Sequence, residues 1–375
     1  MPNQPPVKTN HMASPRPIIV VEDDPFLRLI QVILDPTTPQ DRVAAFAHFM
    51  AHDEPDFTGW CERLRAKLGT FFPAEVRLVK SEVDLLANLS GAQIVVVEGI
   101  TIDANAIAAA GDSLKIVQKY GTITTGIDHT ACAAAGIRVL TLRRRANIAT
   151  AEHGLALMLA LARRLNQNSN LISIEQLRAA GFTPTTFARA HTPNGNWARI
   201  KGLRTLYGQQ LGIIGLGEIG RELALRAAAL GMRIVYTQRH RLAQDVEDSY
   251  RATYSPLDDL LANSDCVSLH LPRTAETHGF IGRRELAMIK TGALLINVSQ
   301  PELVDREALR EALASGHLGG YGLDIFYEEP AAADEPLTQF RNIIITPHLG
   351  GSPRTNALND FDELLTGLAQ TLIGR

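Results

Sequence analysis

Three glycines with the spacing G-x-G-x-x-G stand in the middle of the chain, at Gly215, Gly217 and Gly220. An apolar run, Leu211 to Ile214, precedes them, and a segment with helical periodicity, Glu218 to Leu230, follows them. Gly215 permits a tight turn, Gly217 allows the backbone to approach a pyrophosphate, and Gly220 allows the helix to lie close to the strand. Because a helix N-terminus also offers N–H groups and a partial positive charge, we predict that this segment binds a dinucleotide.

The residues after the next apolar run bear on the choice of dinucleotide. NAD-binding units usually carry a carboxylate about 20 residues after the glycines, which accepts a hydrogen bond from the ribose 2′-hydroxyl. Gln238 stands at that place, followed by Arg239, His240 and Arg241. No carboxylate repels a 2′-phosphate here, and guanidinium groups bind phosphate through paired hydrogen bonds. The segment therefore predicts NADP rather than NAD, although a solvated basic loop has the same composition.

Length and composition limit the class of protein. A chain of 375 residues is longer than an average domain, so two domains are expected. The 45% hydrophobic and 21% charged fractions are typical of a globular enzyme, and a net charge of −3 favours neither nucleic acid nor membrane as a partner. The three cysteines, Cys61, Cys132 and Cys266, form no disulfide or metal pattern, so a cytoplasmic protein without a metal site is expected. No apolar run approaches the roughly 18 residues of a transmembrane helix.

Alternating apolar and helical segments predict parallel α/β domains on both sides of residue 150. Strands are expected at Ile18–Val21, Val76–Val79, Ile94–Val97, Leu114–Gln118, Leu211–Ile214, Met232–Tyr236, Cys266–Leu271, Leu294–Val298, Gly322–Phe326 and Ile343–Thr346. Helices are expected at Asp41–Met50, Gly59–Leu68, Asn147–Arg164, Glu218–Leu230, Arg283–Lys290, Asp305–Ser315 and Leu358–Ile373. Residues 1–16 are rich in Pro and Asn and are predicted to be disordered.

Two further features of the chain bear on its architecture. The helix expected at Asn147–Arg164 is hydrophobic on all sides, which predicts burial between domains or subunits. Residues 166–205 are polar and rich in turn residues, so they form a long excursion that is either a lid or a dimer arm.

Several blocks of sequence, in one order and spacing, resemble the D-isomer-specific 2-hydroxyacid dehydrogenase family, which includes glyoxylate reductases, phosphoglycerate dehydrogenases and formate dehydrogenases. The resemblance runs from about Lys119 to Ser352. Besides the glycine turn, the blocks are Ala151-Glu152-His153, Ser264-Asp265 with Leu269-His270-Leu271-Pro272, Ile296-Asn297-Val298, Leu303-Val304-Asp305, Gly322-Leu323-Asp324-Ile325-Phe326, Glu328-Glu329-Pro330 and Thr346-Pro347-His348-Leu349-Gly350-Gly351.

The resemblance implies a two-domain α/β fold. A Rossmann doubly wound parallel sheet is expected at residues 146–346. A smaller flavodoxin-like parallel α/β substrate domain is expected at residues 17–145 and 347–375. The resemblance also implies a homodimer, and a small carbonyl or hydroxy compound as substrate.

The resemblance places the acid–base catalyst at His348, since histidine can both donate and accept a proton near neutral pH. Glu329 is implied to orient this ring and to stabilise its protonated form. The implied cofactor contacts are Gly215, Leu216, Gly217, Glu218, Ile219, Gly220, Gln238, Arg239, His240, Arg241, His270, Leu271, Pro272, Val298, Ser299, Asp324, His348 and Gly350.

The chain departs from the family pattern where a substrate carboxylate would bind. An arginine normally follows Asn297 by three positions, but Gln300 stands there and carries no charge. Ile123 stands where the glycine-rich loop after Gly121 usually has a glycine. Catalytic residues are therefore expected at His348, Glu329 and Gln300. Substrate contacts are expected from Thr122, Ile123, Arg143, Arg144 and Arg145.

Three interpretations stay open. Another cation, from Arg143 to Arg145 or from Lys119, binds the carboxylate; or the substrate lacks that group; or the chain binds cofactor without turnover, as a redox-sensing or scaffold protein. A protein of the last kind does not need both Glu329 and His348. We therefore predict an NAD(P)-dependent oxidoreductase for a 2-hydroxyacid- or 2-oxoacid-like substrate with an altered carboxylate site, and NADP as the preferred cofactor.

Overall fold

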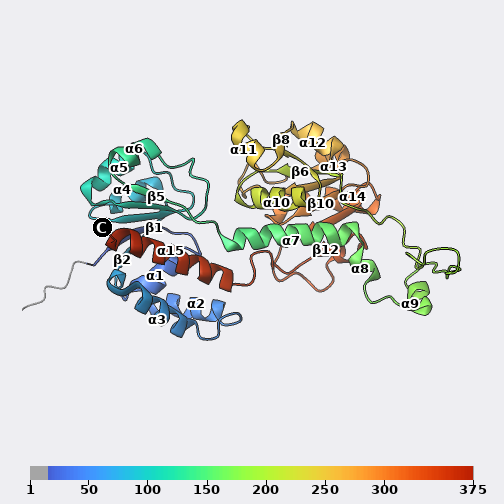
Figure 1. Cartoon of the computed structure of the whole chain (residues 1–375), viewed down its shortest axis with the longest axis horizontal. Coiled ribbons are helices and arrows are strands. Elements are labelled where there is room, and N and C mark those ends of the chain that lie inside the picture. The colour runs from blue at the N-terminus through green and yellow to red at the C-terminus, as the bar shows by residue number, and fades with distance from the viewer. Residues whose placement is uncertain (1–15, 375) are drawn as a thin grey trace, which may run out of the picture. The chain divides into compact units, whose positions relative to one another are not determined.

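Runs of buried aliphatic residues form two separate parallel sheets in this computed structural model, which describes residues 16–374. The chain divides into two units (Figure 1). Of the described residues, the first unit holds 16–144 and 354–374, and the second unit is Arg145–Pro353. Apart from Arg16, the predicted disordered segment lies outside the described residues.

The first unit is built on a five-stranded sheet in the order β2-β1-β3-β4-β5, with every neighbouring pair parallel. Its strands are β1 (Ile18–Glu22), β2 (Glu75–Val79), β3 (Ile94–Val97), β4 (Ile116–Lys119) and β5 (Arg138–Leu140). Its helices are α1 (Arg28–Leu34), α2 (Gln40–Met50), α3 (Phe57–Leu68), α4 (Glu82–Asn88), α5 (Ala104–Ala110), α6 (His129–Ala134) and α15 (Thr355–Ile373), with 3₁₀ turns η1 (Gly69–Phe71) and η2 (Gly111–Ser113). This strand order confirms the predicted flavodoxin-like domain.

Helix α15 returns from the second unit to complete the core of the first. Its buried residue Phe361 stacks on Tyr120, directly after β4, with ring centroids 5.5 Å apart. At its start, the N–H of Arg354 donates to Asp53 Oδ2 at 2.9 Å, which ties α15 to the turn between α2 and α3. The first unit therefore includes chain segments from both ends of the sequence.

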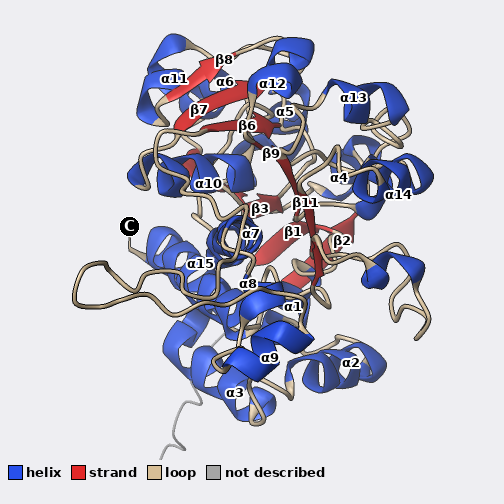
Figure 2. Ribbon diagram, turned by 90° about the vertical axis from the view of Figure 1, so that its right-hand side faces the viewer, coloured by secondary structure: helices blue, strands red, loops and turns tan. Residues whose placement is uncertain are grey.

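The second unit is built on a seven-stranded sheet in the order β12-β11-β10-β9-β6-β7-β8, again wholly parallel. Its strands are β6 (Gln210–Ile214), β7 (Arg233–Thr237), β8 (Ala252–Tyr254), β9 (Cys266–Leu269), β10 (Leu294–Asn297), β11 (Gly320–Leu323) and β12 (Ile343–Ile345). Its helices are α7 (Arg145–Ala162), α8 (Leu165–Asn168), α9 (Ile174–Ala179), α10 (Glu218–Ala229), α11 (Gln244–Ser249), α12 (Leu257–Asn263), α13 (Arg283–Met288) and α14 (Arg306–Ala314), with 3₁₀ turns η3 (Pro301–Leu303) and η4 (Pro336–Gln339). The order confirms the predicted Rossmann sheet, and β6 lies between α12 and α10 (Figure 2).

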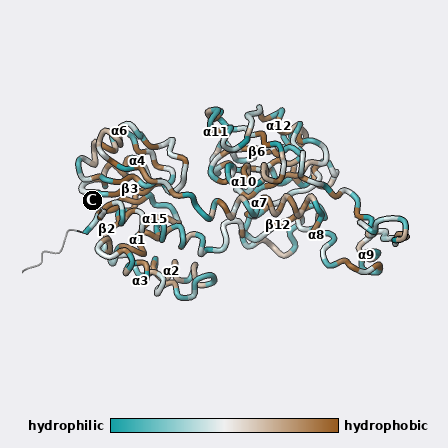
Figure 3. Tube along the Cα trace, viewed as in Figure 1, coloured by the Kyte–Doolittle hydropathy of each residue, from teal (hydrophilic) through white to brown (hydrophobic). Residues whose placement is uncertain are grey.

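Helix α7 packs against α10 and against β10 and β11. Two glycines permit this close approach, because a Cβ on Gly322 would lie 3.1 Å from Leu157 Cβ, and one on Gly154 would lie 3.4 Å from Val298 Cγ1. Hydrophobic residues run along the helix (Figure 3). One face of α7 is buried within the single chain, whereas Leu159 on it is exposed, so burial of that residue between subunits stays a prediction.

Residues 163–205 leave α7, extend away from the sheet of the second unit and return to β6 (Figure 1). The turn-rich composition left α8 and α9 unpredicted. Helix α9 begins at a capping box, in which Ser173 and Gln176 bond each other's backbone N–H groups. Most side chains of this segment are exposed.

The boundary residues differ slightly from the expected ones. Arg145 and Pro347 to Pro353 fall in the second unit, because backbone groups of His348, Leu349 and Gly350 all bond Asp324 at the end of β11. Strand β11 starts two residues before the expected strand and ends at Leu323. Within residues 16–374, no helix is both long enough and apolar enough to cross a membrane.

Candidate active site at the carboxyl ends of the second sheet

The carboxyl ends of the strands in the second unit carry most of the predicted site residues. Because all neighbouring strands are parallel, these ends share one edge of the sheet. The chain order reverses between β6 and β9, and ligands of doubly wound sheets bind in the crevice at such a point. The residues that follow the strands are Gly215 after β6, Gln238 after β7, His270 after β9, Val298 to Gln300 after β10, Asp324 after β11 and Thr346 after β12.

The glycine turn after β6 has the geometry that a pyrophosphate requires. Gly215 has a φ of 94°, and a Cβ there would lie 2.5 Å from the carbonyl oxygen of His270. A Cβ on Gly220 would lie 2.4 Å from the carbonyl oxygen of Gly215, so only glycine lets α10 start this close to the turn. A Cβ on Gly217 meets no described atom within 4 Å, which leaves an open cradle at the N-cap of α10. The first-turn N–H groups of α10 can bind an anion there.

Gln238 is bound to the glycine turn and to its own loop. Its Oε1 accepts a hydrogen bond from the N–H of Leu216 at 3.2 Å, and its Nε2 donates to the carbonyl oxygen of His240 at 2.7 Å. Arg239 is exposed and forms no ion pair with any described residue. Gln238 therefore lies beside the glycine turn, and the cofactor contacts of Gln238 and Arg239 stay predictions.

Arg241, a predicted cofactor contact, forms an ion pair with a carboxylate of its own unit. Its Nε and Nη2 each donate to the carboxylate of Glu247 at 2.8 Å, and the Tyr236 hydroxyl donates to the same carboxylate at 2.7 Å. Hydrogen bonds from Arg241 and Tyr236 lower the pKa of Glu247 to about 2. Arg241 thus fixes the loop after β7 to α11, a pairing that the sequence analysis did not predict.

His270 lies at the end of β9, against Gly215. Burial lowers the pKa of His270 to about 4, so its ring is neutral near pH 7. Its Nε2 faces the hydroxyl of Ser268 at 2.9 Å, whereas its buried Nδ1 has no hydrogen-bond partner in the described part of the chain. A buried polar atom without a partner is costly, which fits a site that a ligand group completes.

His348 and Glu329 face each other in the second unit. His348 Nδ1 lies 2.9 Å from Glu329 Oε2, and the other oxygen of Glu329 accepts a hydrogen bond from the N–H of Phe326 at 3.2 Å. The His348 side chain is 54% exposed, and its Nε2 points away from Glu329. With Nδ1 bound to a carboxylate, Nε2 is the nitrogen that can exchange a proton with a substrate.

Asp324 holds the loop that contains His348. Its Oδ1 accepts hydrogen bonds from the hydroxyl of Thr346 at 2.7 Å and the N–H of Leu349 at 2.8 Å, and its Oδ2 accepts from the N–H of Gly350 at 2.7 Å. Burial raises the pKa of Asp324, but these hydrogen bonds and one from His153 outweigh it and lower the pKa to about 2. Asp324 is therefore ionised at neutral pH.

The block Ala151-Glu152-His153 carries part of the family resemblance, but no role for His153 was predicted.

Residues at the end of β10 fix the position of the Gln300 backbone. The Nδ2 of buried Asn297 donates to the carbonyl oxygen of Gln300 at 2.9 Å, and its Oδ1 accepts from the N–H of Ser299 at 3.0 Å. The Ser299 hydroxyl donates to the carbonyl oxygen of Leu269 at 2.9 Å, which joins this turn to β9. The backbone at Gln300 is thus fixed, and its side chain is partly exposed.

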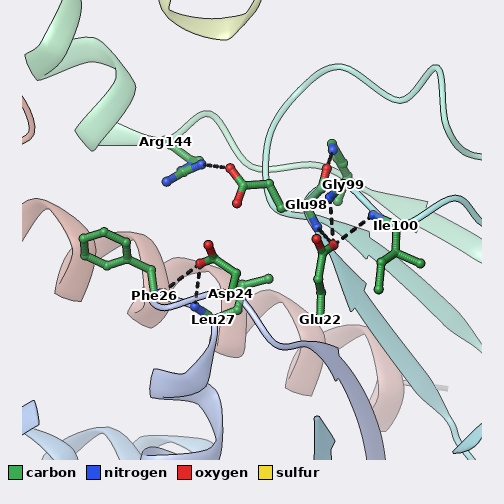
Figure 4. A network of polar contacts seen from close by, with 9 residues as sticks. Glu22, Asp24, Phe26, Leu27, Glu98, Gly99, Ile100 and Arg144 are labelled. Atoms are coloured by element: carbon green, nitrogen blue, oxygen red, sulfur yellow. Dashed lines mark hydrogen bonds and ion pairs between the residues drawn. The ribbon is translucent and has the colours of Figure 1, made fainter. Parts of the chain in front are cut away.

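The predicted substrate residues Thr122, Ile123, Arg143 and Arg144 belong to the first unit, whereas Arg145 begins α7. Arg144 already has partners, because its guanidinium pairs with Glu98 (Figure 4). The same guanidinium lies 4.1 Å from the ring centroid of Tyr120. Glu22 fixes the same loop by accepting hydrogen bonds from three successive N–H groups, at 2.6, 2.7 and 3.0 Å (Figure 4). Lys119 donates to the carbonyl oxygen of Glu98. Arg144 is therefore paired within the first unit, and its contact with a substrate carboxylate stays a prediction.

Residues 155–350 match the D-isomer specific 2-hydroxyacid dehydrogenase, NAD binding domain. This chain belongs to the D-isomer specific 2-hydroxyacid dehydrogenase family. The matched region contains the glycine turn, the strand ends described above and the Glu329–His348 pair, and it is the nicotinamide-cofactor domain of the family.

Relatives within this family carry two different names. D-3-phosphoglycerate dehydrogenase from Archaeoglobus fulgidus is 32% identical over 287 residues, which are 76% of this chain and 50% of the relative. Glyoxylate reductase from Thermococcus gammatolerans is 36% identical over 248 residues, which are 64% of this chain and 67% of the relative. The aligned part thus spans about half the length of the first relative and two thirds of the second.

Solved structures show the same fold. A glyoxylate reductase from Paecilomyes thermophila is 26% identical, with a TM-score of 0.53, and the match covers 95% of each chain. A protein from Thermus thermophilus is 34% identical, with a TM-score of 0.51, and the match covers 84% of this chain and 94% of that one.

Substitutions of Gly217 and Gly220 are expected to have separable effects on stability and on cofactor binding. Gly220→Ala is expected to lower both Tm and nicotinamide-dinucleotide affinity, because its Cβ collides with the backbone of Gly215. Gly217→Ala is expected to leave Tm unchanged and to weaken binding by about tenfold, since its Cβ occupies only the cradle. Thermal unfolding and calorimetric titration measure the two effects. Unweakened binding by the Gly217→Ala protein would contradict a pyrophosphate at this position.

Proposed function

We propose that this chain is a nicotinamide-dependent oxidoreductase that moves a hydride between its cofactor and the hydroxyl or carbonyl carbon of a 2-hydroxyacid- or 2-oxoacid-like substrate. The observation that carries this proposal is the Glu329–His348 pair, 2.9 Å apart, in the same unit as the glycine turn. An acid–base group beside a dinucleotide cradle is what carbonyl reduction requires. A protein that only binds cofactor needs no such pair.

In this mechanism the nicotinamide supplies the hydride in reduction and accepts it in oxidation. During reduction, His348 Nε2 donates a proton to the carbonyl oxygen while the hydride reaches the carbonyl carbon. During oxidation, Nε2 takes the hydroxyl proton as the carbon loses its hydride. Glu329 keeps the ring in one orientation and stabilises the imidazolium by its negative charge. The residues that would hold the cofactor are Gly215, Leu216, Gly217, Glu218, Ile219, Gly220, Gln238, Arg239, His240, His270, Leu271, Pro272, Val298, Ser299, Asp324 and Gly350.

We propose NADP as the cofactor, and two features of the loop after β7 support this choice. Gln238, which faces the turn through Leu216, is uncharged, and exposed Arg239 is a cation beside it. A guanidinium binds a 2′-phosphate through charge-assisted hydrogen bonds. A carboxylate at residue 238 would instead accept from a 2′-hydroxyl and repel the phosphate.

The substrate carboxylate, in this proposal, is bound without an arginine at the end of β10. Gln300 offers an amide there, and Arg144 is occupied by Glu98 and Tyr120. An amide can donate one or two hydrogen bonds to a carboxylate but adds no charge attraction. We therefore expect this chain to prefer acids over matched uncharged carbonyls less strongly than a protein with arginine at this position would.

We also propose a homodimer that forms through α7 and the extended segment 163–205. Leu159 on α7 and Leu225 on the neighbouring α10 are 36% and 37% exposed. Apolar side chains on adjacent helices provide a surface that a second copy can cover.

The proposed reaction predicts NADPH oxidation with a panel that pairs glyoxylate and hydroxypyruvate with aldehydes and ketones lacking the carboxylate. His348→Gln is expected to lower kcat by about 100-fold or more with little change in NADPH affinity, because the proton donor is lost. Steady-state kinetics and NADPH titration measure both. His278→Gln, an exposed histidine of the same unit, is the control and is expected to behave as wild type. Full turnover by the His348→Gln protein, or no turnover of any carbonyl by wild type, contradicts the proposal.

Cofactor preference is tested at residue 238. Gln238→Asp is expected to move the ratio of kcat/KM for NADPH and NADH toward NADH by about tenfold or more, because the new charge repels the 2′-phosphate. Gln238→Asn keeps an uncharged amide and should retain the preference of the wild type. An identical ratio in the Asp and Asn variants would show that residue 238 does not lie beside the 2′-phosphate.

Sedimentation velocity tests the dimer. Wild type is expected to sediment as a dimer, whereas Leu159→Asp is expected to sediment as a monomer, because the interface would bury the new charge. Val83→Asp changes a residue that is 78% exposed on α4 and is expected to stay dimeric. A monomeric wild type overturns this part of the proposal.

A further inference from the structure

His153, on α7, lies against two side chains from the ends of neighbouring strands. Its Nε2 is 2.8 Å from the Thr346 hydroxyl, after β12, and 3.2 Å from Asp324 Oδ1, after β11. The close packing of α7 on the sheet, permitted by Gly154 and Gly322, brings the imidazole this near. The His153 side chain is only 19% exposed.

The direction of these hydrogen bonds follows from counting protons. A threonine hydroxyl has one proton, and Thr346 donates it to Asp324 Oδ1 at 2.7 Å. The Thr346 oxygen can then only accept from His153, and the ionised carboxylate of Asp324 can also only accept. Nε2 of His153 must therefore carry a proton, whether the ring is neutral or charged.

Asp324 connects this contact to the loop of His348. The N–H of His348 donates to the Asp324 carbonyl oxygen at 2.9 Å, and the next two N–H groups donate to its carboxylate. His348 has a φ of 57°, a left-handed conformation that a non-glycine residue adopts only when its surroundings hold it. A Cβ on Gly350 would lie 2.7 Å from Asp324 Oδ2, so the carboxylate fits the loop tightly. The orientation of the His348 ring thus depends on where Asp324 sits.

We propose that His153 is a positioning residue for catalysis: by donating from Nε2 to Thr346 and Asp324, it fixes the carboxylate that holds the His348 loop. This inference rests on the proposed function of His348. His153 itself touches neither substrate nor the reacting atoms. Its role is to keep Asp324 ionised and in place.

The charged groups around this network belong to a few elements. His153 comes from α7, Asp324 from the end of β11, and the His348–Glu329 pair from the loops after β12 and β11. The neighbour of His153 on α7, Glu152, is exposed and pairs with Arg226 of α10 at 3.0 Å. Among the described ion pairs, His153 is the one basic partner of Asp324.

The test compares His153→Leu, which lacks the donor, with His153→Gln, whose amide can donate from about the position of Nε2. His153→Leu is expected to lower kcat by between about tenfold and 100-fold with a smaller change in KM, because the catalytic ring is displaced. His153→Gln is expected to recover most of kcat. His278→Leu, an exposed histidine, is the control for loss of an imidazole.

The pH profile separates positioning from a purely structural loss. The hydrogen bond from His153 is one of those that lower the pKa of Asp324, so its removal raises that pKa. Since the loop is held by the ionised carboxylate, the acid limb of kcat/KM is expected to move to higher pH in His153→Leu and to return in His153→Gln. A lower kcat with an unmoved acid limb overturns the proposal.

A readout without turnover keeps the inference distinct from the proposed function. In protein with ¹⁵N-labelled histidine, the imidazole signals of His348 are expected to shift in His153→Leu and to return in His153→Gln. Thr346→Val, which removes the hydroxyl while keeping the shape, is expected to shift them too and serves if His153→Leu does not fold. Unchanged His348 signals overturn the positioning role even in an active enzyme. Shifted signals in a protein that reduces no carbonyl overturn only the proposed function.

Discussion

The buried carboxylate of Asp324 is the contact on which the candidate site depends. It accepts hydrogen bonds from two backbone N–H groups, a hydroxyl and an imidazole, and these donors stabilise its negative charge. Because each donor offsets part of the free energy that burial of the charge costs, loss of one donor would destabilise the folded state. The loop that carries His348 is bent around this charge, and α7 must pack closely on the sheet to supply one of its donors.

Much of the fold could be predicted because its signals are local. Continuous apolar runs such as Ile94–Val97 belong to strands covered on both faces, and the glycines at 215, 217 and 220 mark the turn into α10. The three-residue strands β5 (Arg-Val-Leu) and β8 (Ala-Thr-Tyr) were missed because, unlike the equally short β12 (Ile-Ile-Ile), they contain no continuous apolar run. The leucines and alanines of α7 predict burial, but they do not distinguish burial within one chain from burial against a partner subunit.

The site could be predicted only in part. Glu329 and His348 were paired through the family resemblance, since nothing in the spacing of two loop residues brings them together. The engagement of Arg144 by Glu98 and of Arg241 by Glu247 could not be foreseen, because a run of arginines looks the same whether it binds a ligand or a neighbouring carboxylate. His153 was visible as part of a sequence block, but its contact needs the position of α7 on the sheet.

The contact between Arg241, Glu247 and Tyr236 has a consequence for how this protein family can change. These residues anchor one end of the loop after β7 to α11, and Gln238 anchors the other end to the glycine turn through its amide. Arg239 lies between the two anchors and faces solvent. Evolution can therefore exchange the side chain at residue 239 without disturbing the scaffold, whereas a change at residue 238 alters both nucleotide recognition and an anchor of the loop.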